Sequence, residues 1–330
     1  MTVRVFTGLK PTGRLQLGNY LGAIRPLLEL ASDPDNDVLV SVVDLHALTV
    51  EHDPAQLREH TFEMAATLLA CGLDPRARLF VQSSVPLHTE LSYLLESTAS
   101  YGEMRRMVQF KDKSQGQDST RLSLLTYPTL MAADILAYRT QIVPVGEDQR
   151  QHLELTRTLA ERFNGRYGPV FTVPRGVTPP EAARVKDLRE PTVKMGKSGA
   201  DGRGVVFLMD SPDTIAAKVR RAVTDTEPEL EHRPGERPGV SNLATILGAL
   251  TGRSAEKSLE GVPGAAALKK LVTEAIVETL VPIQDTYREL AVDRSKILAD
   301  LSEAAGFAAA EAAATVRAAR QAIGLMEVRR

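Results

Sequence analysis

Apolar runs of strand length alternate with segments of helical periodicity over the first 82 residues of this 330-residue chain. The runs at residues 3–6, 38–43 and 78–82 are mostly apolar, which is typical of parallel strands covered on both faces. Apolar positions between the first two runs recur at helical spacing: Leu17, Leu21, Ile24 and Leu28. The order strand, helix, strand, helix, strand predicts an α/β fold. We expect a doubly wound parallel (Rossmann-like) nucleotide-binding sheet with its ligand at the carboxyl ends of the strands.

Helical periodicity dominates the rest of the chain. Helices are predicted over residues 90–99, 101–110, 127–138 and 148–163, from Ser211 onward, and after a charged connector at 224–239. Two further strands are predicted at 141–145 and 205–209. The polar stretch 111–119 is predicted to be a mobile loop. Basic side chains in and before this stretch either meet RNA or form a solvated face: Arg105, Arg106, Lys111 and Lys113.

Composition narrows the class of protein. With 40 basic and 42 acidic side chains, any nucleic-acid contact must come from a local patch. The single cysteine, Cys71, excludes an internal disulfide and a cysteine-rich zinc site, and its helical context predicts a small core residue. No signal peptide or spanning helix is recognisable, so we expect a cytoplasmic protein.

The first loop has the features of an anion site. Gly8, Pro11 and Gly13 end the first strand, and Gly18-Asn19 begins the following helix. Unpaired N–H groups and the positive end of a helix dipole favour phosphate there. The alternative is an ordinary first turn of a parallel sheet, which also requires glycine and proline.

One carboxylate is predicted to lie among large apolar side chains. At a period of 3.6 residues, Asp134 shares a helix face with Tyr127, Met131, Ile135 and Tyr138. Burying an ionised group without a partner is costly or shifts its pKa. Either a protein group or a ligand must therefore donate to Asp134.

Polar residues also follow two predicted strands. His46 follows the second strand, where it either faces a ligand or caps the strand. Glu147, Asp148 and Gln149 follow the strand at 141–145, where they either cap the next helix or bind ribose hydroxyls. Four other histidines lack partner spacing and are predicted at the surface: His52, His60, His88 and His232.

The glycine-rich segment Lys194-Met195-Gly196-Lys197-Ser198 is predicted to move, and its two lysines suit either a triphosphate or bulk solvent. Together with Gln16-Leu17-Gly18-Asn19, it resembles the paired signatures of class I aminoacyl-tRNA synthetases. The Gly-Asn ending is typical of the tryptophanyl branch. Residues 124–136, 143–149 and 237–243 resemble further segments of that branch, so the resemblance to bacterial tryptophanyl-tRNA synthetases covers essentially the whole chain.

This resemblance implies a domain organisation and an activity. Residues 1–210 would form the catalytic domain, with a helical insertion at about 101–165 and a signature loop at 194–198, and residues 211–330 a helical domain that binds the tRNA anticodon. The implied enzyme activates L-tryptophan with ATP and transfers it to tRNA(Trp). Mg²⁺ would be bound through the ATP phosphates and not by protein side chains. A cytoplasmic homodimer is expected, with neither DNA nor a membrane as a partner.

The resemblance also assigns residues. Tryptophan would contact Asp134 through its indole N–H and would be lined by Phe6, His46, Tyr127, Met131, Ile135 and Gln149. ATP would contact Lys10, Pro11, Thr12, Gly18, Asn19, Gly146, Glu147, Asp148, Val185, Lys194, Met195, Gly196, Lys197 and Ser198. Catalytic roles would fall to Lys197, Lys194, Asn19, Gln16 and Lys10.

Three positions depart from the family pattern. Gln16 replaces the usual His or Thr and can still donate a hydrogen bond, while Gly196 replaces a Ser and removes a hydroxyl. Lys10 stands where many members carry Gln. An ammonium group beside the amino acid could alter affinity for tryptophan-mimicking inhibitors, so we consider an inhibitor-tolerant isoform.

Three other interpretations are compared with this one. A tyrosyl-tRNA synthetase shares the fold and also uses a buried acid. A small nucleotidyltransferase shares the phosphate-binding signature but has no need of a helical C-terminal third. A catalytically silent paralogue that binds RNA would have no need of Asp134, Lys194 and Lys197.

Overall fold

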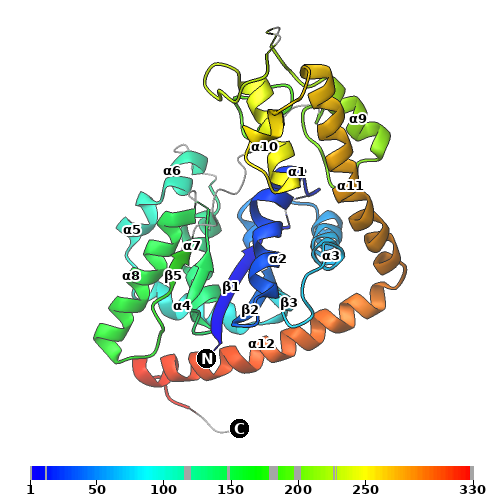
Figure 1. Cartoon of the computed structure of the whole chain (residues 1–330). Helices are drawn as coiled ribbons and strands as arrows, with labels where there is room; N and C mark the ends of the chain where they lie inside the picture. The colour runs from blue at the N-terminus through cyan, green and yellow to red at the C-terminus, as the bar shows by residue number, and fades with distance from the viewer. Residues whose placement is uncertain are drawn as a thin grey trace.

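The computed structural model describes residues 2–11, 13–114, 120–146, 149–177, 185–196, 202–225, 227 and 229–327. Within these ranges five parallel strands form one sheet in the order β3-β2-β1-β4-β5 (Figure 1). The strands are β1 (Val3–Leu9), β2 (Asn36–Val42), β3 (Arg78–Val81), β4 (Ile142–Pro144) and β5 (Arg175–Val177). The predicted α/β class and parallel sheet are confirmed, although the short strand β5 was not predicted.

Helices and helical turns connect these strands, and the described elements that follow β5 are all helical. The α-helices are α1 (Leu17–Asn19), α2 (Arg25–Ser32), α3 (Pro54–Ala70), α4 (Leu87–Glu96), α5 (Tyr101–Arg106), α6 (Val108–Ser114), α7 (Leu122–Leu136), α8 (Arg150–Tyr167), α9 (Pro212–Arg220), α10 (Pro238–Thr251), α11 (Ala265–Val292) and α12 (Arg294–Ile323). Single turns are η1 (Tyr20–Ile24), η2 (Leu45–Thr49), η3 (Gln82–Ser84) and η5 (Lys257–Leu259). In the part of the chain that the structure describes, no helix is both long and apolar enough to cross a membrane.

The strand order fixes where a ligand can approach. From β1 the chain proceeds through β2 to β3 on one side, and then crosses to β4 on the other side of β1. In open α/β sheets a ligand binds at such a reversal, outside the carboxyl ends of the strands. Here that position lies between the ends of β1 and β4, which lead into Lys10 and Gly146.

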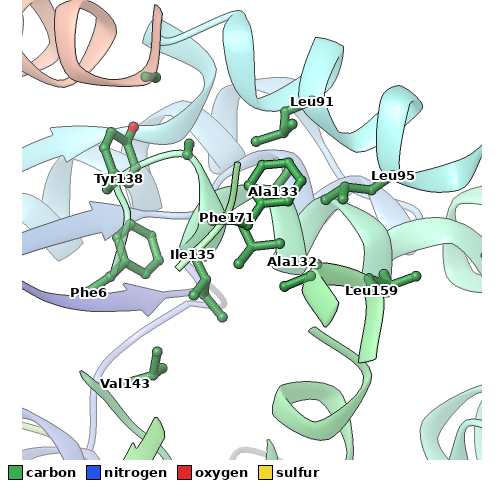
Figure 2. Packing of buried hydrophobic residues seen from close by; sticks show 14 of the residues in the cluster. Phe6, Leu91, Leu95, Ala132, Ala133, Ile135, Tyr138, Val143, Leu159 and Phe171 are labelled. Atoms are coloured by element: carbon green, nitrogen blue, oxygen red, sulfur yellow. The ribbon is translucent and has the colours of Figure 1, made fainter. Parts of the chain in front are cut away.

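Alternate side chains of the strands face opposite helical layers, as a doubly wound sheet requires. Val5 and Val38 pack in one core cluster with Leu68 of α3. Phe6 and Leu39, their neighbours in sequence, pack in another core cluster. Helices on this second face contribute the buried side chains Leu91, Leu95, Ala132, Ile135 and Leu159 (Figure 2).

The last helix covers the edge of the sheet. Helix α12 runs beneath the other elements in Figure 1 and packs along strand β3, where the guanidinium of Arg78 lies 3.8 Å from the ring centroid of Phe307. Ile297 joins the cluster on one sheet face, whereas Ala312 joins the cluster on the other. Covering an edge strand in this way prevents it from pairing with another chain.

A third core cluster joins α9, α10 and α11 to parts of the chain that precede them. Leu17 and Leu21 from the first helical segment belong to it, together with buried side chains between Val185 and Leu208. The signature segment therefore packs with the C-terminal helices as well as with the first loop. The domain boundaries given above stay a prediction.

Three predicted elements differ in the structure. Residues 205–209 form no strand: Phe207 makes only an isolated bridge with Gln16, because helices α9, α10 and α11 bury the apolar run away from the sheet. The predicted helix at 101–110 is interrupted at Met107, whose ψ of 129° is extended. The predicted loop at 111–119 is helical up to Ser114, and residues 115–119 lie outside the described residues.

Candidate active site at the carboxyl ends of the strands

A buried carboxylate, Asp134, is held by three side chains. Asp134 lies on α7 with only 1% of its surface exposed. Its Oδ1 accepts hydrogen bonds from His88 Nδ1 at 2.6 Å and Gln82 Nε2 at 2.8 Å, and its Oδ2 accepts from His46 Nε2 at 2.9 Å and the same Gln82 nitrogen at 2.8 Å. Of the two alternatives open from the sequence, protein groups therefore supply donors to Asp134.

These three donors come from the ends of two strands and the helix that follows. His46 lies in η2 after β2, Gln82 lies directly after β3, and His88 lies in the first turn of α4. The main-chain N–H of Leu45 donates to Gln82 Oε1 at 3.0 Å. Because a main-chain N–H can only donate, the amide oxygen of Gln82 must face Leu45 and its NH₂ group must face Asp134.

The donors determine the charge of Asp134. Burial raises the pKa of this carboxyl group, but the hydrogen bond from His46 and the attraction and hydrogen bond of His88 outweigh burial and lower the pKa to about 2. Asp134 is therefore an ionised acceptor at neutral pH, buried together with its polar donors beside an apolar core.

Behind His88 the network continues to Tyr138. The Nε2 atom of His88 hydrogen-bonds the Tyr138 hydroxyl, whose pKa is raised by burial and by the charge of Asp134. The Tyr138 ring stacks on Phe6, with centroids 5.7 Å apart and planes 16° apart (Figure 2). Phe6 was predicted to line the amino-acid pocket, and the structure places it in the core beside Tyr138.

The prediction that His88 lies at the surface is wrong. Its exposed fraction is 0%, because α4 begins at Leu87 and not near residue 90, so His88 lies on the same buried helix face as Leu91 and Leu95. The 3.6-residue spacing of these three positions is the sequence signal that would have located it. Of the other three histidines, His52 is exposed and His60 and His232 are partly buried.

Tyr127 lies on the open side of the Asp134 network. Its hydroxyl lies 2.5 Å from His152 Nε2 and 3.3 Å from Gln109 Oε1, and its ring meets the His46 ring edge-on at 6.1 Å. Burial raises the pKa of Tyr127 to about 12. Met131 is partly buried against the same core cluster as the fully buried Ile135, so Ile135 offers little surface to a ligand.

Lys10 is linked to this cluster through Thr49. The ammonium of Lys10 donates to Thr49 Oγ1 at 3.4 Å, and that hydroxyl donates to the His46 carbonyl oxygen at 2.9 Å. Burial and the nearby charge of Lys113 lower the pKa of Lys10. The adjacent Pro11 is buried, and Thr12 lies outside the described residues.

The first loop and the signature segment meet at Gln16. Its Oε1 accepts from the Gly18 N–H and Asn19 Oδ1 accepts from the Gln16 N–H, which together form a capping box at the start of α1. The Nε2 atom of Gln16 donates to the Met195 carbonyl oxygen at 2.7 Å. The two segments singled out in the sequence are therefore in direct contact.

The signature segment is a short hairpin-like turn as far as it is described. Lys186 and Lys194 form an antiparallel bridge, and the Met195 N–H donates to the Val185 carbonyl oxygen at 3.0 Å. Met195 and Val185 are buried, Gly196 is partly buried, and Lys194 is exposed. Lys197 and Ser198 lie outside the described residues.

The segment after β4 is described only in part. Gly146 is exposed, and its carbonyl oxygen accepts from the Gln149 N–H at 3.0 Å, just before α8. Glu147 and Asp148 lie outside the described residues. Gln149 precedes the turn of α8 that presents His152 to Tyr127, so its helix begins beside the Asp134 cluster.

Part of the predicted set thus forms two connected groups. His46, Tyr127 and Lys10 are linked around Asp134, and Gln16, Gly18, Asn19, Val185, Lys194 and Met195 are linked around the first loop. The sequence analysis missed Gln82, His88 and the role of Tyr138.

The fold and this site define a nucleotide-binding α/β enzyme of the synthetase class. The chain belongs to the tRNA synthetases class I (W and Y), whose sequence model matches residues 1–280. It is 52% identical to tryptophan–tRNA ligase 1 of Streptomyces coelicolor over 328 residues, which cover 98% of this chain and 97% of the relative.

Two solved structures are similar over the whole length. The tryptophanyl-tRNA synthetase of Mycoplasma pneumoniae aligns with a TM-score of 0.86 and 38% identity, over 99% of both chains. That of Campylobacter jejuni, complexed with ADP and tryptophan, aligns with a TM-score of 0.83 and 30% identity, over 98% of this chain and all of the other. The family resemblance inferred from the sequence is confirmed.

Proposed function

We propose that this protein is a tryptophan–tRNA ligase that activates L-tryptophan with ATP and transfers it to tRNA(Trp). The observation that carries the amino-acid assignment is the ionised, buried carboxylate of Asp134 beside apolar and aromatic side chains. The full-length similarity to tryptophan–tRNA ligases supports the assignment.

Asp134 is proposed to accept the indole N–H at a position that Gln82 now shares. A carboxylate offers about four lone-pair positions, and three donor groups make four contacts with Asp134, because Gln82 Nε2 lies 2.8 Å from both oxygens. When Gln82 donates to one oxygen alone, the position that it leaves on the other matches the single indole N–H of tryptophan. An amino acid without that donor would leave the acceptor unpaired, and such mismatches discriminate strongly between substrates.

ATP is proposed to bind where the first loop meets the signature segment. Three parts of the chain are assigned to ATP. They are the first loop (Lys10, Pro11, Thr12, Gly18 and Asn19), the segment 146–148 after β4, and Val185 together with residues 194–198. Because the Val185 side chain lies in the core, its contribution would come from the main chain. We assign Mg²⁺ to the ATP phosphates, where it would neutralise charge.

The proposed chemistry proceeds in two displacements. A tryptophan carboxylate oxygen attacks the α-phosphorus of ATP in line, the bond to the bridging oxygen breaks, and pyrophosphate leaves with that oxygen. Lys194 and Lys197 would stabilise the charge that develops on pyrophosphate. The 2′-hydroxyl of the terminal adenosine of tRNA then attacks the tryptophanyl carbonyl and releases AMP. The protein's contribution is positioning and electrostatics.

The tRNA and a second subunit are both proposed to bind along the helices α4 to α7. Arg105, Arg106, Lys111 and Lys113 are exposed on α5 and α6, where RNA phosphates could reach them. The same two helices, together with α4 and α7, expose large apolar side chains, a feature typical of protein interfaces: Tyr93, Tyr101, Val108 and Leu122. We assign the latter surface to a homodimer and the C-terminal helices to the anticodon. The protein would act in the cytoplasm, where its tRNA substrate is used.

The test is amino-acid-dependent ATP–pyrophosphate exchange with tryptophan, tyrosine and phenylalanine in parallel. Exchange with tryptophan alone is the expected result. Exchange with tyrosine would instead identify a tyrosyl-tRNA synthetase. Exchange with none of the three amino acids would favour the silent paralogue or the nucleotidyltransferase. Asp134→Asn keeps the side-chain shape but replaces one acceptor oxygen by NH₂, and should abolish tryptophan selectivity.

A further inference from the structure

We propose that His88 is a positioning residue for tryptophan selection: it holds the Asp134 carboxylate in place from behind without touching the substrate. The inference rests on the proposed function, in which Asp134 accepts the indole N–H. It concerns the part of the network that no ligand can reach.

The burial of His88 limits what it can do. Its exposed fraction is 0%, and its ring lies edge-on to Phe80 at 6.1 Å and to Tyr138 at 5.5 Å. By contrast, 11% of the His46 side chain is exposed, so it lies at the open side of the carboxylate. His88 therefore acts on a substrate indirectly, through the Asp134 carboxylate that it contacts.

The hydrogen bonds of His88 determine which ring nitrogen carries a hydrogen. An ionised carboxylate only accepts, so Nδ1 must carry the hydrogen that faces Asp134. The other ring nitrogen, Nε2, faces the Tyr138 hydroxyl, which can either donate to it or accept from it. Tyr138 thereby orients His88, and His88 orients Asp134.

Losing the His88 donor would have two consequences. Asp134 Oδ1 would retain only Gln82, and the carboxylate could rotate within its pocket. The buried charge would also lose one of the two histidines that stabilise it, so its pKa would rise. Both effects weaken an indole acceptor. The hydrogen bonds of His88 go to Asp134 and Tyr138 and not to a residue assigned to ATP, so ATP binding should change little.

Two substitutions separate positioning from packing. His88→Asn retains a side-chain N–H close to the Nδ1 position, whereas His88→Leu fills similar space without any donor. Tyr138→Phe removes the hydroxyl that orients the ring and keeps the stacking on Phe6. Circular dichroism and thermal unfolding would establish that each variant folds.

Tryptophan binding can be measured without catalysis because the chain contains no tryptophan. Selective excitation of the indole band then reports only the added amino acid, and its anisotropy gives the dissociation constant. Exchange kinetics supply KM for tryptophan, KM for ATP and kcat in the same variants.

We expect His88→Leu to raise the dissociation constant and KM for tryptophan by about tenfold or more, with KM for ATP within about twofold of the wild-type value. His88→Asn should recover most of this loss, and Tyr138→Phe should give an intermediate effect. In His88→Leu, KM for tryptophan should also increase as the pH falls from 8 to 5.5, whereas the wild-type value should change less. Other titratable groups also bear on this pH dependence. His46 and His88 contact Asp134 directly, the charge of Asp134 raises the pKa of Tyr138, and the charge of Arg4 opposes that increase.

Wild-type tryptophan affinity in a folded His88→Leu variant would overturn the inference, as would a folded His88→Asn variant as impaired as His88→Leu. The proposed function itself would be refuted by a different result: a wild-type protein that neither binds nor activates tryptophan. If Asp134→Asn abolishes tryptophan selectivity while His88→Leu changes nothing, the proposed function stands and the role of His88 is refuted.

Discussion

The side-chain amide of Gln16 donates to the main-chain carbonyl of Met195 over 2.7 Å, across 179 positions of sequence. Gln16 caps the first helical turn, and Met195 lies in the signature segment. Both side chains are buried, so the hydrogen bond is shielded from water. The two proposed phosphate-binding segments are thus in direct polar contact.

Gln16→Glu should release this contact while keeping the helix cap. A glutamate oxygen can still accept from the Gly18 N–H, but it has no hydrogen to donate to the Met195 carbonyl and would face it with a charge. We expect trypsin to cleave the segment at Lys194 and Lys197 several-fold faster in the variant, measured without ATP. Cleavage at sites elsewhere in the same chain is the matched control. If trypsin cleaves at Lys194 and Lys197 equally fast in the wild type and in Gln16→Glu, the proposed role of Gln16 is contradicted.

The lowered pKa of Asp134 predicts a pH dependence of stability. Its pKa is about 2 in the folded protein and near 3.8 otherwise, so the stabilisation is fully present above about pH 4 and is lost as the pH falls toward 2. The expected contribution is about 2 kcal/mol in the free energy of unfolding. Urea unfolding of the wild-type protein and Asp134→Asn should therefore give a difference that shrinks below pH 4.

Glu103 is the control for this titration. The hydrogen bond from Arg162 lowers its pKa to about 2, with a smaller opposing effect of burial, so Glu103 titrates over the same range. Glu103 lies on α5, at the surface and outside the Asp134 network. In a Glu103→Gln background, replacing Asp134 by Asn should still change the free energy of unfolding in the same pH-dependent way. If the free energies of unfolding of the wild type and Asp134→Asn differ by the same amount from pH 6 to pH 2, the lowered pKa of Asp134 is contradicted.

The burial of Asp134 could be predicted from sequence, but its partners could not. Periodicity along one helix is local information, and it correctly placed Asp134 on a buried face. Its donors His46, Gln82 and His88 lie 46 to 88 positions earlier and come together only through strand order and packing. Non-local contacts of this kind leave no spacing in the sequence.

Short apolar runs do not by themselves distinguish a sheet strand from a buried non-strand segment, because non-local packing decides between them. Residues 38–43 became a strand because β1 and β3 lie on either side of them. Residues 205–209 have a similar run, yet helices α9 to α11 bury them and only Phe207 makes a bridge. Local capping signals are less ambiguous: Asp53 before Pro54 and Ser211 before Pro212 each cap a helix, as this residue pattern favours.

Asn242 links the C-terminal helices to the signature segment. Its Oδ1 accepts from the Lys186 N–H at 2.8 Å, and its Nδ2 donates to the Lys186 carbonyl oxygen at 3.0 Å. Asn242→Ala leaves both main-chain groups without this partner and should lower the free energy of unfolding by about 2 kcal/mol. Asn242→Asp retains the acceptor but places a buried carboxylate against the Lys186 carbonyl oxygen, so at neutral pH it should be at least as destabilised as Asn242→Ala in urea unfolding. An unchanged midpoint for Asn242→Ala would show that water replaces the side chain without loss.

Lys10→Gln tests the hypothesis of inhibitor tolerance. Lys10 is linked through Thr49 to His46, so its charge lies beside the proposed amino-acid pocket. Replacing it by an uncharged amide should increase sensitivity to tryptophan-mimicking inhibitors by about tenfold, measured as inhibition of exchange. KM for tryptophan should change less, and identical inhibition of the two proteins would remove the basis for the hypothesis.

Lys197→Ala tests whether the signature lysine acts in the transition state. If Lys197 binds the leaving pyrophosphate more strongly as its charge develops, removing the ammonium should slow adenylate formation by about 100-fold or more. ATP affinity should fall much less, because the ground-state contact is weaker. The measurement is single-turnover formation of tryptophanyl-adenylate at saturating ATP. Lys270→Ala on α11 is the matched control, since this exposed lysine pairs only weakly with Glu274 at 3.8 Å. Equal losses in ATP affinity and single-turnover rate would instead make Lys197 a ground-state binding residue.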